Sequence, residues 1–342
     1  MTSNVLNERL SLAFEWYRGM VSPDTGRLAY AYHPVRDTLV VDGHHIRDIA
    51  AVWDLAILSG FLARSELRPV IETSLDHYTS MLVRHGSGSI LDAQRLGESS
   101  SIAHSAFLAL ALLESNRTTT VVGVVDAIID QQRDDGSYRI YFGGEPDEGL
   151  DLYPGEAMLA LLEAYARTQD ARYLKSAERG FAIHRDRRPA YEIDPQLLVF
   201  YANWQAQYGS LLHEHTRSAS CRADVRDYIW SLQDHILRSG FFDRVERTPD
   251  AQVNVEVACA LEGISDAYAI AQREHDARHM DAYARAMRIA LVHLLHAQRL
   301  ANCAARERGG FGQTLADRTQ RIDVTGHVVA GFIKTLHCDI NM

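Results

Sequence analysis

The chain has 342 residues, of which 46% are apolar and 23% charged, the balance of a globular protein. Its net charge of −10 is spread along the sequence, and the lack of long Lys or Arg runs argues against nucleic acid as a partner. Residues 1–12 lack the apolar core of a secretory signal, and no apolar run approaches the roughly 20 residues that span a bilayer. We therefore expect a cytoplasmic protein without a membrane or nucleic-acid partner.

Twelve segments with helical periodicity follow one another along the chain, and strand-like alternation is nearly absent. In the first segment an apolar stripe recurs at i, i+4, i+7, i+8 and i+11, which predicts a helix with one wet face. That stripe consists of Leu6, Leu10, Ala13, Phe14 and Tyr17. The twelve segments are 4–20, 44–63, 66–84, 99–115, 119–133, 154–168, 171–184, 195–209, 222–237, 252–272, 279–299 and 322–337.

Glycine turns separate these segments at quasi-regular intervals. They are anchored at Gly26, Gly88, Gly136, Gly240 and Gly310. Successive anchors are 62, 48, 104 and 70 residues apart, and the interval of 104 is about twice the others. We therefore expect a sixth turn, without glycine, near residues 185–189.

The even-numbered segments carry runs that are apolar almost all the way round, in 102–113, 157–162, 197–202, 255–261 and 328–333. A helix that is apolar on every side must be buried on every side. Alternation of one-sided and all-round helices predicts an inner ring inside an outer ring, which six hairpins close into an all-α (α/α)6 toroid. Closure would let residues 1–342 share one core as a single domain. An open solenoid of helix pairs is the alternative, with shorter repeats of about 34–47 residues.

Polar side chains gather where the glycine turns lead into the inner helices, so the sequence predicts one polar mouth lined by six helix starts. Carboxylates there also have a structural explanation, because Asp and Glu cap free amides and complement the helix dipole by about 0.3–2 kcal/mol. Asp194, followed by Pro195, is the clearest such cap. The predicted site comprises His44, Arg47, Glu98, His104, Tyr153, Glu156, Glu192, Asp194, Asn254, Glu256, Arg321, Asp323 and His327.

Two spacings within this set suggest particular roles. Asp323 and His327 lie four residues apart on one helix face, which suits a carboxylate that orients a histidine or two ligands of one metal. We favour the hydrogen-bonded pair and predict no metal and no cofactor. Arg47 can hold a substrate carboxylate through two parallel hydrogen bonds, or instead form a structural ion pair with Asp48.

The four cysteines receive no role from the sequence. Cys221, Cys259, Cys303 and Cys338 are far apart and form no C-x-x-C pair. Neither a structural zinc site nor a disulfide framework is therefore predicted.

The glycine turns, the stretch LYPGEAMLALLEAYARTQDARYLKSAERGF (152–181) and the ending GGFGQ…RIDVTGH (309–327) together resemble the six-hairpin (α/α)6 sugar-processing enzymes. That group contains glycoside hydrolases, unsaturated-uronate hydrolases, sugar 2-epimerases and uronyl C5-epimerases. The resemblance covers nearly the whole chain and implies a carbohydrate or uronate substrate with acid–base chemistry by carboxylates, His or Tyr. The DxDD motif of class II terpenoid cyclases and the zinc-binding Cys-His signature of lanthionine cyclases are both missing from the sequence.

The leading hypothesis is an enzyme that acts on a small or oligomeric sugar, or a uronate, by metal-independent acid–base catalysis. Glu156 with Glu192 or Asp194 would flank a glycosidic bond at about 5–9.5 Å, and His327 is the fourth candidate catalytic residue. An epimerase or lyase would instead move a proton with His or Tyr beside a carboxylate held by Arg47 or Arg321. A tailoring cyclase or isomerase for a natural product and a non-catalytic binding toroid are the alternatives, and the oligomeric state stays open.

Overall fold

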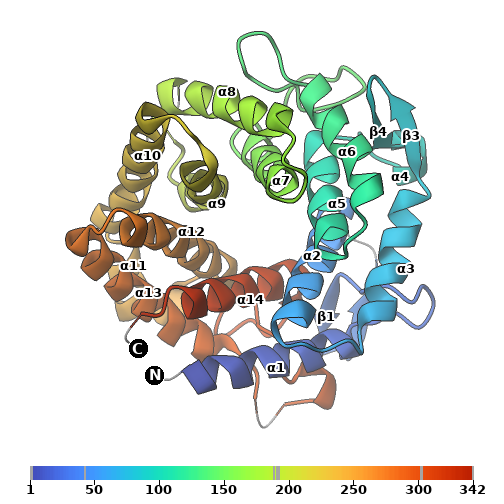
Figure 1. Ribbon diagram of the computed structural model, residues 1–342. Coiled ribbons are helices and arrows are strands. Elements are labelled where there is room, and N and C mark those ends of the chain that lie inside the picture. The colour runs from blue at the N-terminus through green and yellow to red at the C-terminus, as the bar shows by residue number, and fades with distance from the viewer. Residues whose placement is uncertain (1–2, 42–43, 188, 190–192, 301–302, 341–342) are drawn as a thin grey trace. The chain divides into compact units, whose positions relative to one another are not determined.

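The computed structural model describes residues 3–41, 44–187, 189, 193–300 and 303–340 (Figure 1). The chain divides into two compact units, which we call the terminal unit (Met1–Ser74 with Ile236–Met342) and the central unit (Leu75–His235). That residues 1–342 form a single domain stays a prediction. Among the described residues, no helix combines the length and the apolar character needed to cross a membrane.

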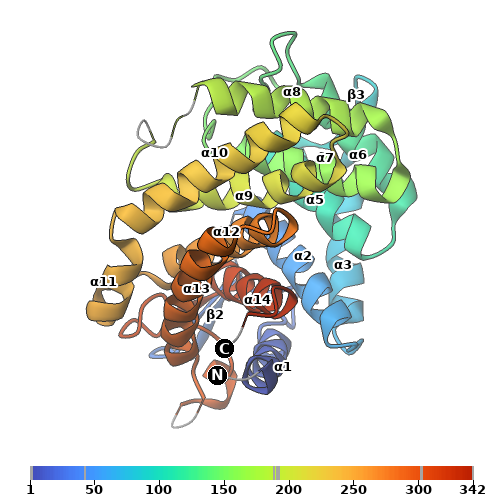
Figure 2. The same cartoon turned by 60° about the vertical axis from the view of Figure 1, so that its left-hand side comes forward.

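In the terminal unit, α14 lies between α2 and α12, while α1 packs against α14 and α13 against α12 (Figures 1 and 2). The inner members of this group are therefore α2, α12 and α14. The helices of the unit are α1 (Ser3–Gly19), α2 (His45–Phe61), α11 (Phe241–Arg247), α12 (Asn254–Arg273), α13 (Ala277–Ala297) and α14 (Ile322–His337), with 3-10 turns at Pro249–Ala251 and Ala305–Glu307. Two further helices, α3 (Arg68–Thr79) and α10 (Ala219–Arg238), extend across the boundaries of the two units.

The central unit repeats this arrangement. There α7 lies between α5 and α9, with α6 packed on α5 and α8 on α7 (Figure 1). Its helices are α4 (Ala93–Leu96), α5 (Ile102–Glu114), α6 (Thr118–Asp130), α7 (Tyr153–Thr168), α8 (Ala171–Arg187) and α9 (Leu198–His215). The inner helices of both units are the even-numbered segments of the sequence, as predicted.

Each of the twelve predicted segments corresponds to one helix of at least 12 residues in the described part of the chain. Two segments end at the wrong place: 195–209 stops six residues short of the end of α9, and 66–84 runs too far, because α3 ends at Thr79 and Leu82–His85 forms strand β3. This strand pairs with β4 (Gly88–Leu91) in an antiparallel hairpin, and the two residues between them, Gly86 and Ser87, form the tight turn. The predicted turn near 185–189 falls partly on residues 188 and 190–192, which lie outside the described residues.

A small antiparallel sheet in the terminal unit was not expected from the sequence. Strand β1 (Ala31–His33) lies between β2 (Thr38–Val40) and β5 (Gln320–Arg321), with Ala31 opposite Arg321. The backbone of Tyr30 extends this pairing, since its carbonyl accepts from the Ile322 amide at 3.1 Å. The sheet therefore fixes Tyr30 at the first turn of α14.

The inner helices differ in how completely they are buried. Every residue of α5 from Ile102 to Leu113 is buried, in agreement with its all-round apolar sequence. On α14 the apolar run Val328–Ile333 is mostly buried, but one stripe keeps contact with water. The stripe follows i, i+4, i+7 and i+11 and consists of Asp323, His327, Ala330 and Lys334.

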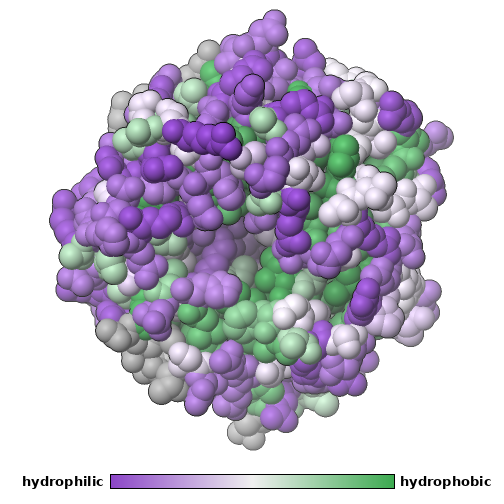
Figure 3. All heavy atoms as spheres, viewed as in Figure 1, coloured by the Kyte–Doolittle hydropathy of each residue, from purple (hydrophilic) through white to green (hydrophobic). Residues whose placement is uncertain are grey.

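The face of the protein that Figure 3 presents is mostly hydrophilic, with smaller hydrophobic areas between the hydrophilic side chains. The exposed large apolar side chains of the described residues are scattered along the chain, and Val35, 93% exposed, is the most accessible. Single exposed apolar residues of this kind are ordinary in globular proteins.

Candidate acid–base site on α14

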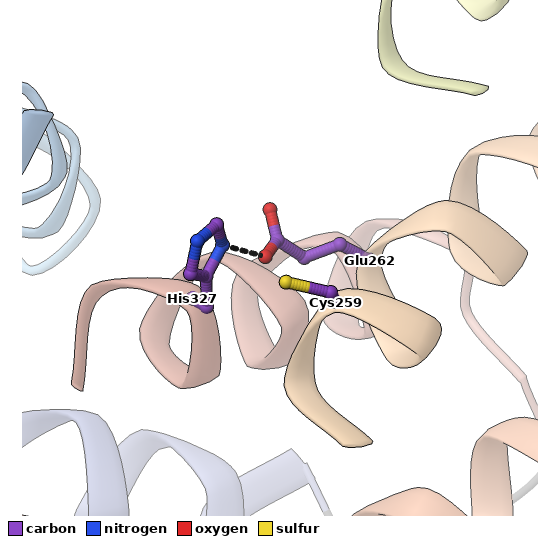
Figure 4. Close-up of side chains that lie close together, drawn as sticks. All are labelled: Cys259, Glu262 and His327. Carbon is purple, nitrogen blue, oxygen red and sulfur yellow. Dashed lines mark hydrogen bonds and ion pairs between the residues drawn. The ribbon is translucent and has the colours of Figure 1, made fainter. Parts of the chain in front are cut away.

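Several ionisable side chains of the terminal unit gather around the first turns of α14. Helices α2 and α14 run in the same direction there, because Arg47 and Asp323, both in a first turn, lie 3.4 Å apart. Helix α12 contributes Cys259 and Glu262 opposite His327 (Figure 4). We call the resulting group the α14 site; it comprises Tyr30, Arg47, Asp54, Cys259, Glu262, Arg321, Asp323 and His327.

Two arginines share one carboxylate at the start of α14. Nε of Arg321 donates to Oδ1 of Asp323 at 2.9 Å, a second nitrogen of Arg321 donates to Oδ2, and Nε of Arg47 lies 3.4 Å from Oδ2. Burial by itself would raise the pKa of Asp323, but the hydrogen bonds and charges of Arg321 and Arg47 outweigh burial and lower it. Two guanidinium groups and one carboxylate leave one net positive charge. This charge is accessible to solvent at Arg47, because the Arg47 side chain is 42% exposed.

Tyr30 contacts both arginines of this cationic group. Its hydroxyl accepts from Nη1 of Arg47 at 2.9 Å. The guanidinium carbon of Arg321 lies 5.5 Å from the centroid of the Tyr30 ring, and that of Arg47 lies 5.9 Å away. Cation–π contacts at these distances hold both side chains in place. Asp48, the alternative partner of Arg47 in the sequence analysis, instead pairs with Arg27 at 3.0 Å.

His327 is held by α12. Its Nδ1 lies 2.6 Å from Oε1 of Glu262, and Cys259 lies within hydrogen-bond reach of the same ring (Figure 4). Burial disfavours the charged ring, but the neighbouring Cys259 sulfur and Glu262 carboxylate outweigh burial and hold the pKa of His327 well above its usual range. These contacts favour the protonated imidazole, which can donate a proton or a hydrogen bond from its other nitrogen.

Asp54 is the carboxyl group of the site that retains a proton most readily. It lies on α2, and its Oδ2 would be 1.9 Å from a β-carbon placed on Gly326 of α14. Burial, the largest cause, together with the charges of Glu262 and Asp323 raises the pKa of Asp54 to about 7, although His327 opposes the shift. A carboxyl group of this kind exists in both protonation states at neutral pH, as a general acid or base requires.

One cluster in the site could also hold a metal ion. Cys259, Glu262 and His327 each offer a ligand atom, and these atoms all lie within 4.8 Å of one another. The sequence analysis pointed instead to Asp323 as the partner of His327 through their i, i+4 spacing. In the structure Arg321 holds Asp323, and Glu262 on the neighbouring helix binds His327.

The remaining predicted residues of the terminal unit are not members of the α14 site. Asn254 is fully buried, donates to the Gly312 carbonyl at 2.7 Å and accepts from His293 at 2.9 Å, so it ties the loop before β5 to α12. Glu256 is half-buried, and burial raises its pKa. His44 is exposed at the N-cap of α2 without a capping side-chain bond.

The predicted residues of the central unit occupy their own helix starts. His104 is buried, its Nδ1 accepts from the Ser101 amide at 3.2 Å in a capping box, and its Nε2 lies 3.3 Å from Glu98. Tyr153 and Glu156 lie in the first turn of α7, and Glu156 is buried, with 4% exposure.

Asp194 lies just before α9. It is exposed and accepts from the Gln196 amide at 2.9 Å in the turn before the helix. The N-cap of α9 is Leu197, so the prediction of Asp194 as the helix cap was wrong, because the helix begins later than the Asp-Pro sequence suggests. Glu192 lies outside the described residues. That the two groups of predicted residues share one cavity stays a prediction.

Sequence reasoning missed four members of the α14 site: Tyr30, Asp54, Cys259 and Glu262. Asp54 and Glu262 interrupt apolar runs in the middle of inner helices, AVWDLAIL and ACALEGIS. A charge that a helix buries on every side needs a partner or a function. The sequence carries this signal, but both residues lie in helix interiors and not at the helix starts. Tyr30 carried no comparable signal, because the unexpected sheet places it.

A small hollow between α8 and α10 in the central unit does not resemble a catalytic site. Glu178, Arg185, Cys221 and Asp224 are among its lining residues. Arg185 pairs with Asp224, and Glu178 accepts from Thr216 at 2.7 Å, so these charges serve packing between the helices. Burial also raises the pKa of the Cys221 thiol, which makes it a poor nucleophile.

No protein-family model and no curated protein matches this sequence. Solved structures match it over nearly the whole chain. The unsaturated glucuronyl hydrolase responsible for the degradation of glycosaminoglycan from Bacillus sp. GL1 is 13% identical, with 96% of each chain covered and a TM-score of 0.70. A sugar epimerase from a ruminal bacterium is also 13% identical, with 99% of this chain and 100% of that chain covered and a TM-score of 0.67. The GH76A α-1,6-mannanase from Salegentibacter sp. HEL1_6 is 10% identical, with 98% and 100% covered and a TM-score of 0.70.

Identities this low show the fold alone. The chain has the all-α (α/α)6 six-hairpin fold that carbohydrate hydrolases and sugar epimerases share, which confirms the predicted fold class and the predicted resemblance. Reaction and substrate have to be argued from the site, since one fold supports many reactions.

Proposed function

We propose that the protein is an enzyme that acts on an acidic sugar by acid–base catalysis without a metal, at the α14 site. One observation carries the proposal: Arg47 and Arg321 share Asp323 at the start of α14, and Asp54 packs against Gly326 of the same helix, within electrostatic reach of His327. The fold, shared with carbohydrate hydrolases and epimerases, supports a sugar as the substrate.

Asp54 is the proton-exchanging group in this proposal. With a pKa of about 7 it gives up or accepts a proton at neutral pH, a property that contributes typically 10²–10⁴-fold to catalysis. His327, oriented by Glu262, donates a hydrogen bond to an oxygen of the sugar that gains negative charge during the reaction.

The cationic group binds the substrate's carboxylate. Arg47 is exposed enough to form two parallel hydrogen bonds with a uronate carboxylate, while Asp323 and Tyr30 hold its guanidinium group. The Tyr30 ring offers an apolar surface beside the same position. Glu156, Glu192 and Asp194 of the central unit stay predicted catalytic residues, and the choice between hydrolysis, elimination and epimerisation follows from which proton moves.

The test is a substrate panel with matched variants. Unsaturated uronyl disaccharides, saturated uronides and neutral aryl glycosides are incubated with the enzyme in D2O, and products are followed by NMR. Deuterium on carbon with the glycosidic bond intact identifies an epimerase, and a new reducing end identifies cleavage of the glycosidic bond. We expect turnover of acidic members only, because neutral sugars cannot use Arg47.

Asp54→Asn should lower this turnover at least about a hundredfold and leave the circular dichroism spectrum unchanged, because the amide keeps the shape but exchanges no proton. Asp266→Asn is the matched control, since Asp266 is a carboxyl group on α12 that pairs with Lys334 instead. Full activity in Asp54→Asn, or equal loss in both variants, would remove Asp54 from the mechanism. A sugar that binds but is never converted would indicate a binding protein.

A further inference from the structure

We propose that Cys259, Glu262 and His327 form a binding site for a thiophilic divalent cation of the Zn²⁺ class. The site lies at the contact of α12 and α14 and combines a sulfur, a carboxylate oxygen and an imidazole nitrogen within 4.8 Å of one another (Figure 4). These are the three ligand types that Zn²⁺ uses in proteins. The proposal does not depend on the proposed function, because binding is measured without a substrate.

The helix geometry brings the three ligands together. Cys259 and Glu262 are separated by three residues on α12, so both side chains project from one face of that helix toward α14. His327 meets them from one turn inside the start of α14. Sites of this kind, with two ligands from one helix and one from its neighbour, need no loop to order on binding.

The distances require only small side-chain movements. A tetrahedral Zn²⁺ has a bond of about 2.3 Å to sulfur and about 2.0–2.2 Å to nitrogen or oxygen, which puts neighbouring ligand atoms roughly 3.3–3.8 Å apart. A pair at the 4.8 Å limit would have to close by about an ångström, whereas Nδ1 of His327 and Oε1 of Glu262, at 2.6 Å, must separate slightly. Rotation of the flexible Glu262 side chain can supply most of this movement.

The surroundings allow an ion to enter and keep one coordination position open. The side chain of His327 is 24% exposed, while Cys259 and Glu262 are buried behind it. Three protein ligands leave a fourth position for water, the arrangement of open rather than closed zinc sites. Binding would release the proton of the Cys259 thiol and the proton shared between His327 and Glu262, so the metal takes the place of that hydrogen bond.

Cobalt titration tests the proposal. The full-length protein, reduced and stripped of metal with a chelator, is titrated with Co²⁺, whose bond to a thiolate gives an intense near-ultraviolet absorbance band. We expect one equivalent of Co²⁺ to produce the band and one equivalent of Zn²⁺ to remove it. Cys259→Ser should abolish the band, and Glu262→Gln should weaken Co²⁺ binding by about tenfold or more.

The matched controls are Cys221→Ser and Cys303→Ser, which remove two partly exposed thiols outside the cluster and should leave the band unchanged. His327→Gln covers the case in which Cys259→Ser does not fold, because His327 is partly exposed and its replacement leaves the buried thiol in place. The absence of a band in the wild type, or a band that survives either Cys259→Ser or His327→Gln, would overturn the site.

Discussion

Individual residues of the α14 site differ in charge because of their nearest partners. Asp323 and Asp54 are both carboxyl groups set into the same group of helices. Direct bonds from Arg321 outweigh burial at Asp323 and lower its pKa, whereas burial dominates at Asp54 and raises its pKa to about 7. A hydrogen-bonded cation therefore decides which of the two remains ionised and which can exchange a proton.

His184 shows the opposite balance in the central unit. It is buried on α8, where Nδ1 lies 3.2 Å from the Tyr201 hydroxyl, which is itself 2.6 Å from the Tyr228 hydroxyl. Burial lowers the pKa of His184 to about 4. The folded protein thus keeps this ring neutral in a range where the unfolded chain protonates it.

We expect His184 to make folding stability depend on pH below neutrality. Because its pKa is depressed in the folded state, the contribution is complete above pH 6.5 and is lost as the pH falls toward about 4, up to about 3 kcal/mol. Denaturant unfolding between pH 7 and pH 4 measures it. His184→Gln, which can keep the bond to Tyr201 but does not titrate, should lose less stability over that range, and equal slopes would contradict the assignment.

Among the helices, α14 depends on a glycine for its contact with α2. Gly326 lies inside the helix, where glycine costs about 1 kcal/mol relative to alanine. A β-carbon there would lie 1.9 Å from Oδ2 and 2.7 Å from Cγ of Asp54. The glycine thus lets the carboxyl group approach the helix backbone. The position of Asp54 therefore depends on a residue that makes α14 less stable than alanine would.

Gly326→Ala should displace Asp54 and lower turnover by about a hundredfold, since an error of 1 Å in the position of a catalytic group costs that much. Gly123→Ala in α6 is the control. Its β-carbon would meet Ser89 at 3.5 Å, an ordinary van der Waals contact, and the change should stabilise the protein by about 0.5–1 kcal/mol. Steady-state kinetics and thermal unfolding of both variants measure these changes in turnover and stability. Unchanged kcat in Gly326→Ala would show that the position of the Asp54 carboxyl group does not affect turnover.

The contact between α12 and α14 links metal binding to catalysis. If the reaction needs the proton on His327, an ion held by Cys259, Glu262 and His327 should block it. We therefore expect chelator treatment to leave turnover intact and micromolar Zn²⁺ to inhibit it. Mg²⁺, which prefers oxygen ligands, should have no effect at the same concentration. Loss of activity on chelation, restored by Zn²⁺, would instead make the ion a participant in the reaction.

At the scale of the whole molecule, the inner helices contribute more of the buried apolar side chains than the outer helices do, although they differ in how completely they are buried. In the central unit, α5 illustrates this, because its twelve residues from Ile102 to Leu113 are all buried. A two-sided core of this kind has no position where a charged side chain can reach water.

Leu110→Asp should therefore unfold the protein or make it insoluble. Leu110 is 1% exposed in α5, among buried residues of the same helix, and a carboxylate there would be removed from water. Leu110→Met, which conserves volume, should cost less than about 1.5 kcal/mol. Soluble yield, far-ultraviolet circular dichroism and thermal unfolding measure both. Wild-type thermal stability in Leu110→Asp would place Leu110 outside the core.

The sequence by itself determined the twelve long helices and which of them are inner, because helical periodicity and all-round apolar character are local properties of each segment. It also singled out Arg47, Arg321, Asp323 and His327, which lie at or near helix starts. Only the tertiary structure decided the partners of these groups, since Glu262 and His327 are 65 positions apart and β5 pairs with β1 from near the other end of the chain. Which helix faces another, and which buried charge meets which, depends on packing between segments that no local pattern encodes.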